Sequence, residues 1–344
     1  MEIQTVIIAG GLGSRLWPIS YQENPKQFIK ILGDKSSFQQ TALRNKHLGD
    51  TIVIVNNCHI EIAKRQLEEI AVNAKIIVEP LQRNTAICGI IAAIYAKERN
   101  CDKVAFLPAD HHITDLASYR KSLKKIIKSL QKSNISIIGI KPTLPHTGYG
   151  YIQVGNKIEP GIYQARKFIE KPPLNMAQKF IVQANYFWNS GMFFYHADFM
   201  LLQARKYLPK MLNAAYKAIT NSTKVKNYII LAKKPYSKIK SISLDYGIIE
   251  QIKNMALIKA EFSWSDLGSW DSLWKLRNKD HNDNCIEGNI TTDQVTNSYI
   301  KTDNKAVVVG LDNIIIVDHE DKLLVADRSK SESLKDLVGK FTVK

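Results

Sequence analysis

The 344-residue chain lacks several features that mark whole classes of protein. It has no run of about 18 apolar residues, which excludes a predicted transmembrane helix. Its first segment, MEIQTVIIAGG, has neither a basic region nor a small-residue cleavage site, so we interpret it as the first strand of the fold and not as a signal peptide. No low-complexity segment interrupts the chain. We therefore expect a globular protein without a membrane partner.

Cysteine is scarce and scattered, at Cys58, Cys88, Cys101 and Cys285. No CxxC pair and no cluster of cysteine with histidine occurs, so neither a zinc site nor a disulfide framework is predicted. Isolated cysteines are typical of a reducing compartment. The interpretation is four free thiols in a cytoplasmic protein.

Acidic residues are few relative to basic ones: 32 Asp and Glu against 48 Lys and Arg give a net charge of +16. Such an excess fits nucleic-acid binding, attraction of small polyanionic substrates, or a compositional bias towards Lys, Asn and Ile. No Lys/Arg-rich block with interleaved aromatics is present. We therefore favour bias together with anionic substrates, and expect no nucleic-acid partner.

Residues 1–140 alternate short apolar runs with helical periodicity. After Asp115, apolar residues recur at steps of three and four, which predicts a helix with one apolar face; residues 59–71 and 85–97 show similar patterns. Alternating strands and helices indicate a Rossmann-like α/β sheet, mostly parallel, with helices on both faces. The expected strands are Ile3–Ala9, Thr51–Val55, Lys75–Val78, Lys103–Leu107 and Ile135–Ile140. Ligands of such sheets bind beyond the carboxyl ends of the strands.

From residue 284 the pattern changes to short β-prone runs separated by Asp, Asn and Gly. This predicts a small C-terminal β-rich module closed by a terminal helix, with a domain boundary near Asp283. The expected domains are residues 1–283 and 284–344. The spacing of the runs suggests a β-solenoid-like turn or two, although no clean repeat is present.

A glycine-rich loop, with Gly10, Gly11 and Gly13, follows the first strand directly. Glycines there let backbone N–H groups approach phosphates without obstruction by Cβ. A P-loop is excluded because Gly-Lys-Ser/Thr is replaced by Ser-Arg-Leu, and a dinucleotide fingerprint is excluded because Leu16 stands at its third glycine. What remains is GGxGxRLxP followed by PKQF.

Two cations belong to this pattern, Arg15 and Lys26. A nucleoside triphosphate that loses pyrophosphate develops charge on its α-phosphoryl oxygens and on the leaving group, which fixed cations stabilise. The alternative is a glycine-rich turn with solvated basic residues. The length of the combined pattern favours the phosphate-binding role, and we predict that both residues are catalytic.

The motifs GGLGSRLWP and PKQF resemble those of the bacterial mannose-1-phosphate guanylyltransferases, members of the sugar-nucleotide pyrophosphorylases. Two positions depart from the family pattern: Tyr21 stands where Arg is common, and Ile87 where Pro is common. Tyr21 leaves open whether one phosphate contact is missing. The resemblance covers nearly the whole chain and continues, in order, through EPLQRNTA, LPADHHI, TGYGYIQ, FIEKP, FWNSGMFF, SLDYGIIE, WSDLGSW and GLDNIIIVDHEDKLLVADR.

The resemblance implies a magnesium-dependent transfer of GMP from GTP to mannose 1-phosphate, giving GDP-mannose for polysaccharide or glycan synthesis. Asp110, which follows an expected strand, and Asp266 would bind Mg²⁺; alone, each could equally be a turn or helix-cap residue. Glu79 favours guanine, since a carboxylate accepts from both N1–H and N2–H₂; its alternative is a salt bridge to Arg83. The nucleotide set is Gly10, Gly11, Gly13, Glu79, Arg83, Asn84 and Thr85. The sugar-phosphate set is Gly150, Glu170, Lys171 and Asn189.

Two rival functions remain open from the sequence. One is the same chemistry with another base or sugar, and the other is a catalytically silent regulatory relative. The presence of Arg15, Lys26, Asp110 and Asp266 argues against the silent relative, which would be free to lose them. Relatives also suggest a homodimer through the C-terminal module.

Overall fold

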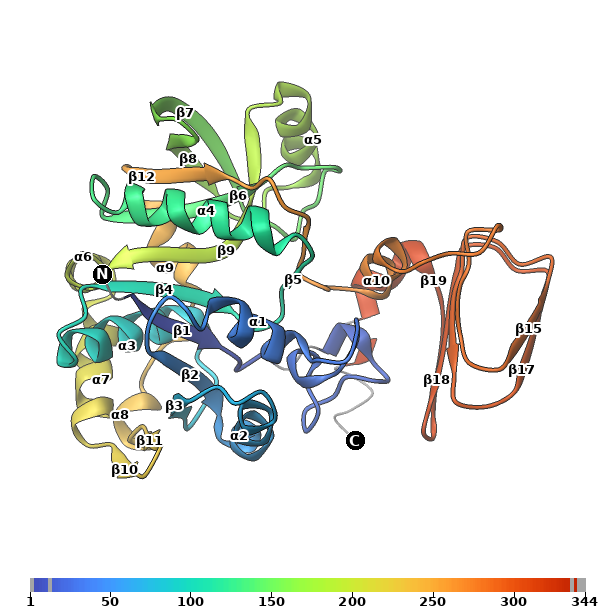
Figure 1. Cartoon of the computed structure of the whole chain (residues 1–344), viewed down its shortest axis with the longest axis horizontal. Helices are drawn as coiled ribbons and strands as arrows, with labels where there is room; N and C mark the ends of the chain where they lie inside the picture. The colour runs from blue at the N-terminus through green and yellow to red at the C-terminus, as the bar shows by residue number, and fades with distance from the viewer. Residues whose placement is uncertain (1–2, 12–13, 335–336, 339–344) are drawn as a thin grey trace. The chain divides into compact units, whose positions relative to one another are not determined.

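An 11-stranded mixed sheet forms the larger part of the protein (Figure 1). The computed structural model describes residues 3–11, 14–334 and 337–338. The strand order is β10-β11-β3-β2-β1-β4-β9-β6-β12-β8-β7. The strands are β1 Gln4–Ile8, β2 Thr51–Asn56, β3 Ala74–Glu79, β4 Lys103–Pro108, β6 Ile135–Ile140, β7 Tyr151–Glu159, β8 Ile162–Ile169, β9 Tyr186–His196, β10 Thr223–Val225, β11 Tyr228–Ile230 and β12 Met255–Lys259.

The expected parallel strands are confirmed, but the sheet as a whole is mixed. β1 pairs in parallel with β2 and β4, and β2 pairs in parallel with β3. β9 lies antiparallel between β4 and β6 and also pairs with β7. Apolar content predicts that YFWNSGMFFYH is buried, yet it does not specify strand direction, which depends on the partners that β9 finds in the folded chain.

Helices cover both faces of the sheet, as alternate residues of β4 demonstrate. Val104 and Phe106 belong to one apolar cluster and Ala105 and Leu107 to another. Successive strand side chains point to opposite faces, so each face has its own core. The main helices are α1 Ser37–Asn45, α2 Ile60–Glu69, α3 Thr85–Glu98, α4 Leu116–Ser129, α5 Leu174–Gln183, α6 Ala197–Tyr207 and α7 Pro209–Thr220.

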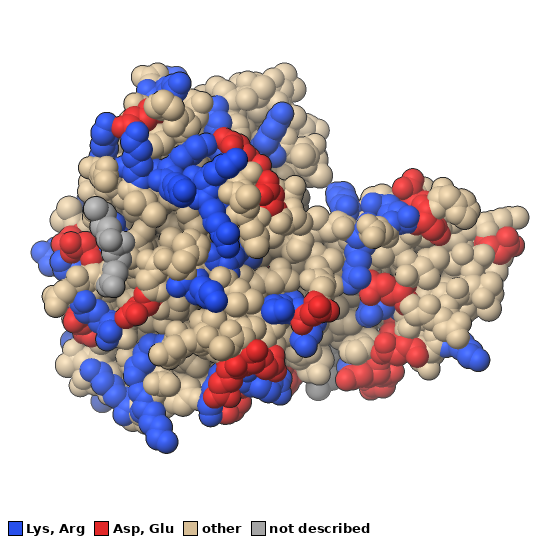
Figure 2. Space-filling view, viewed as in Figure 1, with Lys and Arg blue, Asp and Glu red and all other residues tan. Residues whose placement is uncertain are grey.

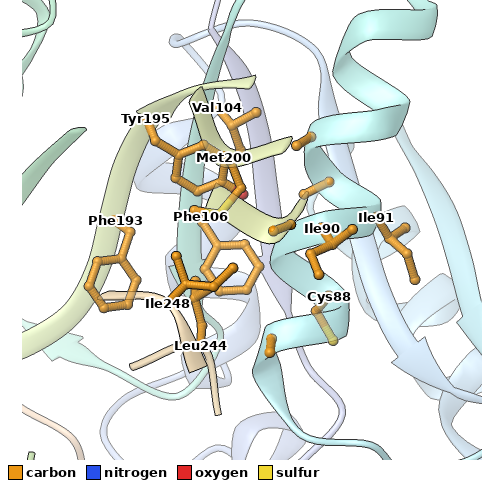
Figure 3. Packing of buried hydrophobic residues seen from close by; sticks show 14 of the residues in the cluster. Cys88, Ile90, Ile91, Val104, Phe106, Phe193, Tyr195, Met200, Leu244 and Ile248 are labelled. Atoms are coloured by element: carbon orange, nitrogen blue, oxygen red, sulfur yellow. The ribbon is translucent and has the colours of Figure 1, made fainter. Parts of the chain in front are cut away.

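One core is built around α3, which is buried on almost every side. Figure 3 shows Ile90 of α3 on the side of the helix that faces Phe106 of β4, whereas Ile91 points away from it; both belong to the same apolar cluster as Met200 on α6. The other core receives α4 through Tyr119, Leu123 and Ile126. The predicted helix after Asp115 is therefore confirmed, and Asp115 itself caps it by accepting from the Ser118 N–H at 3.0 Å.

Part of the positive charge lies on α4, whose outer face carries Arg120, Lys121, Lys124 and Lys128. Figure 2 shows basic side chains gathered over this region. Lys128 pairs with Glu159 at 2.5 Å, so the face is partly compensated by neighbouring strands. None of the helices in the described part of the chain combines the length and apolar character of a membrane span.

Contacts divide the chain into two units that do not follow a single boundary at Asp283. The first unit contains Met1–Gly10, Gln39–Ala109 and Ile113–Trp264, and it holds the large sheet. The second contains Gly11–Phe38, Asp110–His112 and Ser265–Lys344. The early segment belongs to the second unit because Leu16 and Ile31 pack in one apolar cluster with Trp270 and Tyr299.

The second unit is rich in β-structure, as expected. β14 (Cys285–Glu287), β16 (Tyr299–Thr302) and β18 (Ile314–His319) pair in parallel, and β19 (Lys322–Asp327) closes the sheet antiparallel to β18. β15 (Ile290–Asp293) pairs in parallel with β17 (Ala306–Val309). After β19 comes the 3₁₀ helix η5, Arg328–Ser333; most residues of the expected terminal helix lie outside the described part of the chain.

Candidate active site

Within the second unit, Lys26 contacts both predicted metal-binding aspartates, Asp110 through its carboxylate and Asp266 through its main chain. It begins the short helix η2 (Lys26–Phe28), and its side chain is only 9% exposed. Its ammonium lies 2.7 Å from Asp110 Oδ2 and donates to the carbonyl oxygen of Asp266 at 2.5 Å. Two residues from distant parts of the sequence therefore meet at the ammonium of Lys26.

The charge of Lys26 keeps Asp110 ionised. Burial by itself raises the pKa of this carboxyl, but the Lys26 ammonium and His111 outweigh burial and hold the pKa below its ordinary value. An ionised carboxylate is the oxygen ligand that Mg²⁺ prefers. Asp110 is thus in the protonation state that a metal ligand requires.

Asp266 is oriented by a tight turn. Its Oδ1 accepts from the Gly268 N–H at 3.1 Å, and a Cβ at position 268 would lie 2.7 Å from Oδ2. Glycine at 268 therefore permits this carboxylate position. Among described residues no group of three or more His, Cys, Asp or Glu could hold a metal. A divalent ion here would take two protein carboxylates and complete its shell with other oxygens, which suits Mg²⁺ bound to phosphates.

The glycine-rich loop is described only in part. Gly13 lies outside the described residues, whereas the Gly11 carbonyl accepts from Gln27 Nε2 at 2.8 Å. Arg15 lies 3.8 Å from Glu332 Oε2, and both side chains are well exposed. An exposed ion pair of this kind contributes little to stability. The Arg15 guanidinium can therefore leave Glu332 and bind a phosphate.

Glu79 is the last residue of β3 and is almost fully buried, 4% exposed. Its Oε1 accepts from the hydroxyl of Tyr236 and from Cys88 Sγ at 3.3 Å. Burial raises its pKa from the ordinary 4.5 to about 7, against the opposing effect of these two hydrogen bonds. A Cβ on Gly10 would lie 3.0 Å from the other oxygen, Oε2.

The remaining nucleotide residues build the turn into α3. Asn84, at φ +62°, caps the helix by accepting from the Thr85 N–H at 2.8 Å, and Thr85 Oγ1 accepts from the Leu244 N–H at 2.9 Å. Arg83 donates to the carbonyl of Ser237 at 3.1 Å, which is a different contact from the expected alternative with Glu79. The amino end of a helix such as α3 attracts anions.

Gln82 is not among the predicted nucleotide-binding residues. Its Nε2 donates to the carbonyl oxygen of Gly10 at 2.7 Å, so it ties the EPLQRNTA segment to the end of the first strand. Its place inside the EPLQRNTA motif was the only available signal.

The predicted sugar-phosphate residues form one cluster in the first unit. Lys171 Nζ lies 3.0 Å from Glu170 Oε1, and the Asn189 N–H donates to the Gly150 carbonyl at 2.8 Å. A Cβ on Gly150 would lie 2.5 Å from Glu170 Oε2, so only glycine leaves room for that carboxylate. The structure therefore brings all four residues together.

Asp245 joins this cluster through Asn189. Asn189 Nδ2 donates to Asp245 Oδ1 at 2.7 Å, which links residues 56 positions apart in the sequence. Burial raises the pKa of Asp245, and Asn189 opposes the rise. The chain reaches this point on α9 (Leu244–Gly247), which Ser243 caps by accepting from the Tyr246 N–H.

Comparisons with known proteins agree with the motifs. The family described as nucleotidyl transferase matches residues 4–283. The mannose-1-phosphate guanylyltransferase of Sinorhizobium fredii is 34% identical over 99% of this chain and 68% of its own length. The xanthan biosynthesis protein XanB of Xanthomonas campestris is 32% identical over 99% of this chain and 73% of its own.

A solved structure agrees as well. The Thermus thermophilus protein titled mannose-1-phosphate geranyltransferase superposes with a TM-score of 0.88 at 25% identity, covering 99% of both chains. The family match spans most of the chain, and the sequence relatives extend over nearly all of it. The chain therefore belongs to the nucleotidyl transferase family and is an enzyme of the mannose-1-phosphate guanylyltransferase group.

Proposed function

We propose that this enzyme transfers GMP from GTP to mannose 1-phosphate and releases pyrophosphate. The observation that carries the proposal is the contact of the Lys26 ammonium with the carboxylate of Asp110 and with the main-chain carbonyl of Asp266. In the reaction an oxygen of mannose 1-phosphate forms a bond to the α-phosphorus of GTP. The bond from that phosphorus to the β-phosphate oxygen breaks, and its electron pair leaves with pyrophosphate.

Lys26 and Arg15 supply positive charge to the phosphates. Charge that develops on the α-phosphoryl group and on the leaving pyrophosphate is stabilised by fixed cations, and no covalent enzyme intermediate is needed. Asp110 and Asp266 would hold a divalent ion, proposed as Mg²⁺, which when bound supplies charge neutralisation and alignment of phosphate oxygens. Backbone N–H groups of Gly10, Gly11 and Gly13 would line the phosphates.

Glu79 is proposed as the residue that selects guanine. Oε1 is committed to Tyr236 and Cys88, so the carboxylate is held in one orientation by two hydrogen bonds. Arg83, Asn84 and Thr85 would complete the nucleotide contacts through the turn into α3.

We propose that Glu170 and Asn189 bind the sugar of mannose 1-phosphate and that Lys171 binds its phosphate. Gly150 allows the sugar to approach the backbone closely. Their clustering in the first unit supports this assignment. GDP-mannose made in this way would supply polysaccharide or glycan synthesis, as the name of the xanthan biosynthesis relative suggests. The proposed compartment is the cytoplasm.

The C-terminal region is proposed to be a β-solenoid-like module, residues 284–344, that mediates a homodimer. The parallel ladder of β14, β16 and β18 supports the solenoid-like description. The end of the family match at residue 283 supports a boundary at Asp283. Sedimentation of the full chain beside a chain ending at Asp283 tests the dimer, which we expect only in the former.

Pyrophosphate release across the four nucleoside triphosphates and several sugar 1-phosphates tests the reaction. We expect the highest kcat/KM for GTP with mannose 1-phosphate. A preference for UTP, dTTP or ATP, or for another sugar, would contradict the guanylyl or mannosyl assignment while leaving the nucleotidyl transfer itself intact.

A further inference from the structure

A cavity of about 210 Å³ lies in the first unit, at the edge of the large sheet where β1, β2 and β3 begin. The three strands are neighbours and run in parallel (Figure 1). The lining includes Gln4 of β1, Thr51 of β2 and Ala74 of β3. Glu79 lies at the other end of β3, roughly 16 Å along the strand. The lining contains none of the residues that we propose to bind nucleotide or sugar.

Two cations and one carboxylate line this cavity, namely Lys75, Arg99 and Asp50. The Lys75 ammonium donates to the carbonyl oxygen of Lys226 at 2.5 Å, and it forms no ion pair with a carboxylate in the described part of the chain. Arg99 Nη2 lies 3.2 Å from Asp50 Oδ2. One of the two cations is therefore balanced, and the lining carries one net positive charge that favours an anion.

A buried amide gives the cavity a hydrogen-bond acceptor. Gln4 is only 2% exposed, and its Nε2 donates to the main-chain carbonyl of Asp50 at 2.6 Å and lies 3.5 Å from that of Thr5. Gln4 Oε1 accepts from none of the residues that the structure describes. Buried polar groups normally have a partner, so this oxygen is available to a hydroxyl in the cavity.

The mouth and walls of the cavity suit a small polar molecule. Asn73 and Asn227 are exposed lining residues, so the cavity opens to solvent, and their amides can both donate to hydroxyls and accept from them. Tyr95 is a largely buried wall residue, and the Arg99 guanidinium lies 5.9 Å from the centre of its ring. The volume is below the roughly 300–1,000 Å³ of sites for larger ligands. A ligand of small-metabolite size is therefore indicated.

We propose that this cavity binds a small phosphorylated polyol, such as a hexose phosphate, at a site separate from the catalytic one. Lys75 and Arg99 would contact the phosphate, and Gln4 Oε1 would accept from a hydroxyl. A guanidinium has five N–H donors, so Arg99 can bind Asp50 and a phosphate at the same time. A phosphate supplies the counter-ion that Lys75 lacks, and the polyol supplies the donor that the buried amide lacks.

The test is calorimetric titration of the full chain with mannose 6-phosphate, which has no phosphate at C1 and so cannot replace mannose 1-phosphate in the proposed transfer. We expect saturable binding to one site in a titration that extends to roughly 10 mM, well above a dissociation constant of 1 mM. Lys75→Gln and Arg99→Gln should each weaken binding at least about tenfold, because each removes a hydrogen bond to a charged group.

Two further variants show where the probe binds. Lys210→Gln is the matched control, since it removes one positive charge from an exposed position of α7 outside the cavity, and it should keep the wild-type affinity. Lys171→Gln alters the proposed sugar-phosphate residues and should also keep it. Lys75→Gln and Arg99→Gln should retain the wild-type kcat and KM for both substrates, because the cavity is remote from Glu79. Melting curves verify that each variant is folded.

Each result decides for or against the cavity. Absence of saturable binding, or equal affinity in the wild type, Lys75→Gln and Arg99→Gln, overturns the proposal. Loss of binding in Lys171→Gln alone would place the probe at the catalytic site and overturns it as well. Inorganic phosphate that binds as tightly as mannose 6-phosphate overturns the contact between Gln4 and a hydroxyl. The titration requires no turnover, so its result is independent of the base and sugar that the enzyme uses.

Discussion

The ammonium of Lys26 lies 2.7 Å from Asp110 Oδ2 and makes its second short contact with the main chain of Asp266. The ion pair with Asp110 joins a helix near the N-terminus to the loop that follows β4. It neutralises a carboxylate that burial alone would protonate. Lys26 therefore has two functions in the proposed mechanism, as a phosphate ligand and as the group that keeps Asp110 ionised.

Replacing Lys26 or Arg15 with Ala is expected to lower kcat about a hundredfold to a thousandfold, since each removes a cation from the transition state. Steady-state pyrophosphate release checks this, with melting curves to separate activity from unfolding. Lys305→Ala, at an exposed position of the second unit, is the control. Near-normal turnover of both variants would refute the phosphate-binding role.

Asp110→Asn and Asp266→Asn are each expected to raise the Mg²⁺ concentration for half-maximal activity, because each keeps an oxygen ligand but removes a negative charge. Activity should recover partly at high Mg²⁺, and chelation should abolish it in the wild type. Asp321→Asn, which alters an exposed carboxylate next to Lys322, is the control. If a variant reaches half-maximal activity at the same Mg²⁺ concentration as the wild type, the replaced aspartate does not bind the metal.

Glu79→Gln is expected to lower kcat/KM for GTP about tenfold to a hundredfold relative to other triphosphates. Oε1 already accepts from Tyr236 and Cys88, so the amide would place an N–H donor where Oε2 accepts from guanine. The ratio of kcat/KM values for GTP and UTP measures the effect. Tyr236→Phe should lower the same ratio less, because it removes only the hydroxyl that orients Oε1. An unchanged ratio in Glu79→Gln would mean that guanine is selected elsewhere.

Gly150→Ala is expected to raise the KM for the sugar 1-phosphate at least tenfold, roughly the effect of losing one hydrogen bond to a charged group. The new Cβ would lie 2.5 Å from Glu170 Oε2 and must displace that carboxylate. The KM for the triphosphate, determined in the same assays, is the internal control. Parallel changes in both constants would indicate a general distortion of the fold.

The stability of the protein is expected to fall as pH rises from about 4.5 to 7. Both Glu79 and Glu170 have folded-state pKa values raised to about 7, so the folded state binds more protons than the unfolded state in this window. Stability is therefore greater at the acidic end of the window for these two groups. Thermal unfolding from pH 4.5 to 7.5 measures the slope, and Glu79→Gln should make it shallower. A slope that the variant leaves unchanged would place Glu79 in a more solvated setting than the structure indicates.

The sequence by itself determined the local elements of this fold. The apolar run Ile135–Ile140 is β6 with the same bounds, and the three- and four-residue periodicity after Asp115 is α4. The reason is that a helix or strand with one buried face needs apolar residues at the spacing of that element. A capping residue such as Asp115 marks the start of the helix. The glycine-rich loop is also visible in the sequence, and its role in binding phosphates stays a prediction.

Only the tertiary structure decided which of the predicted residues meet. Nothing local to Asp245 indicates that it binds Asn189, or that Glu79 is enclosed by Tyr236 and Cys88. The sequence pattern also did not predict that β9 lies antiparallel between β4 and β6. Such contacts depend on which buried surfaces pack together over long sequence distances, and burial sets the pKa values that govern the chemistry. A sequence pattern records the residues suited to a site, whereas their protonation and their partners are properties of the folded chain.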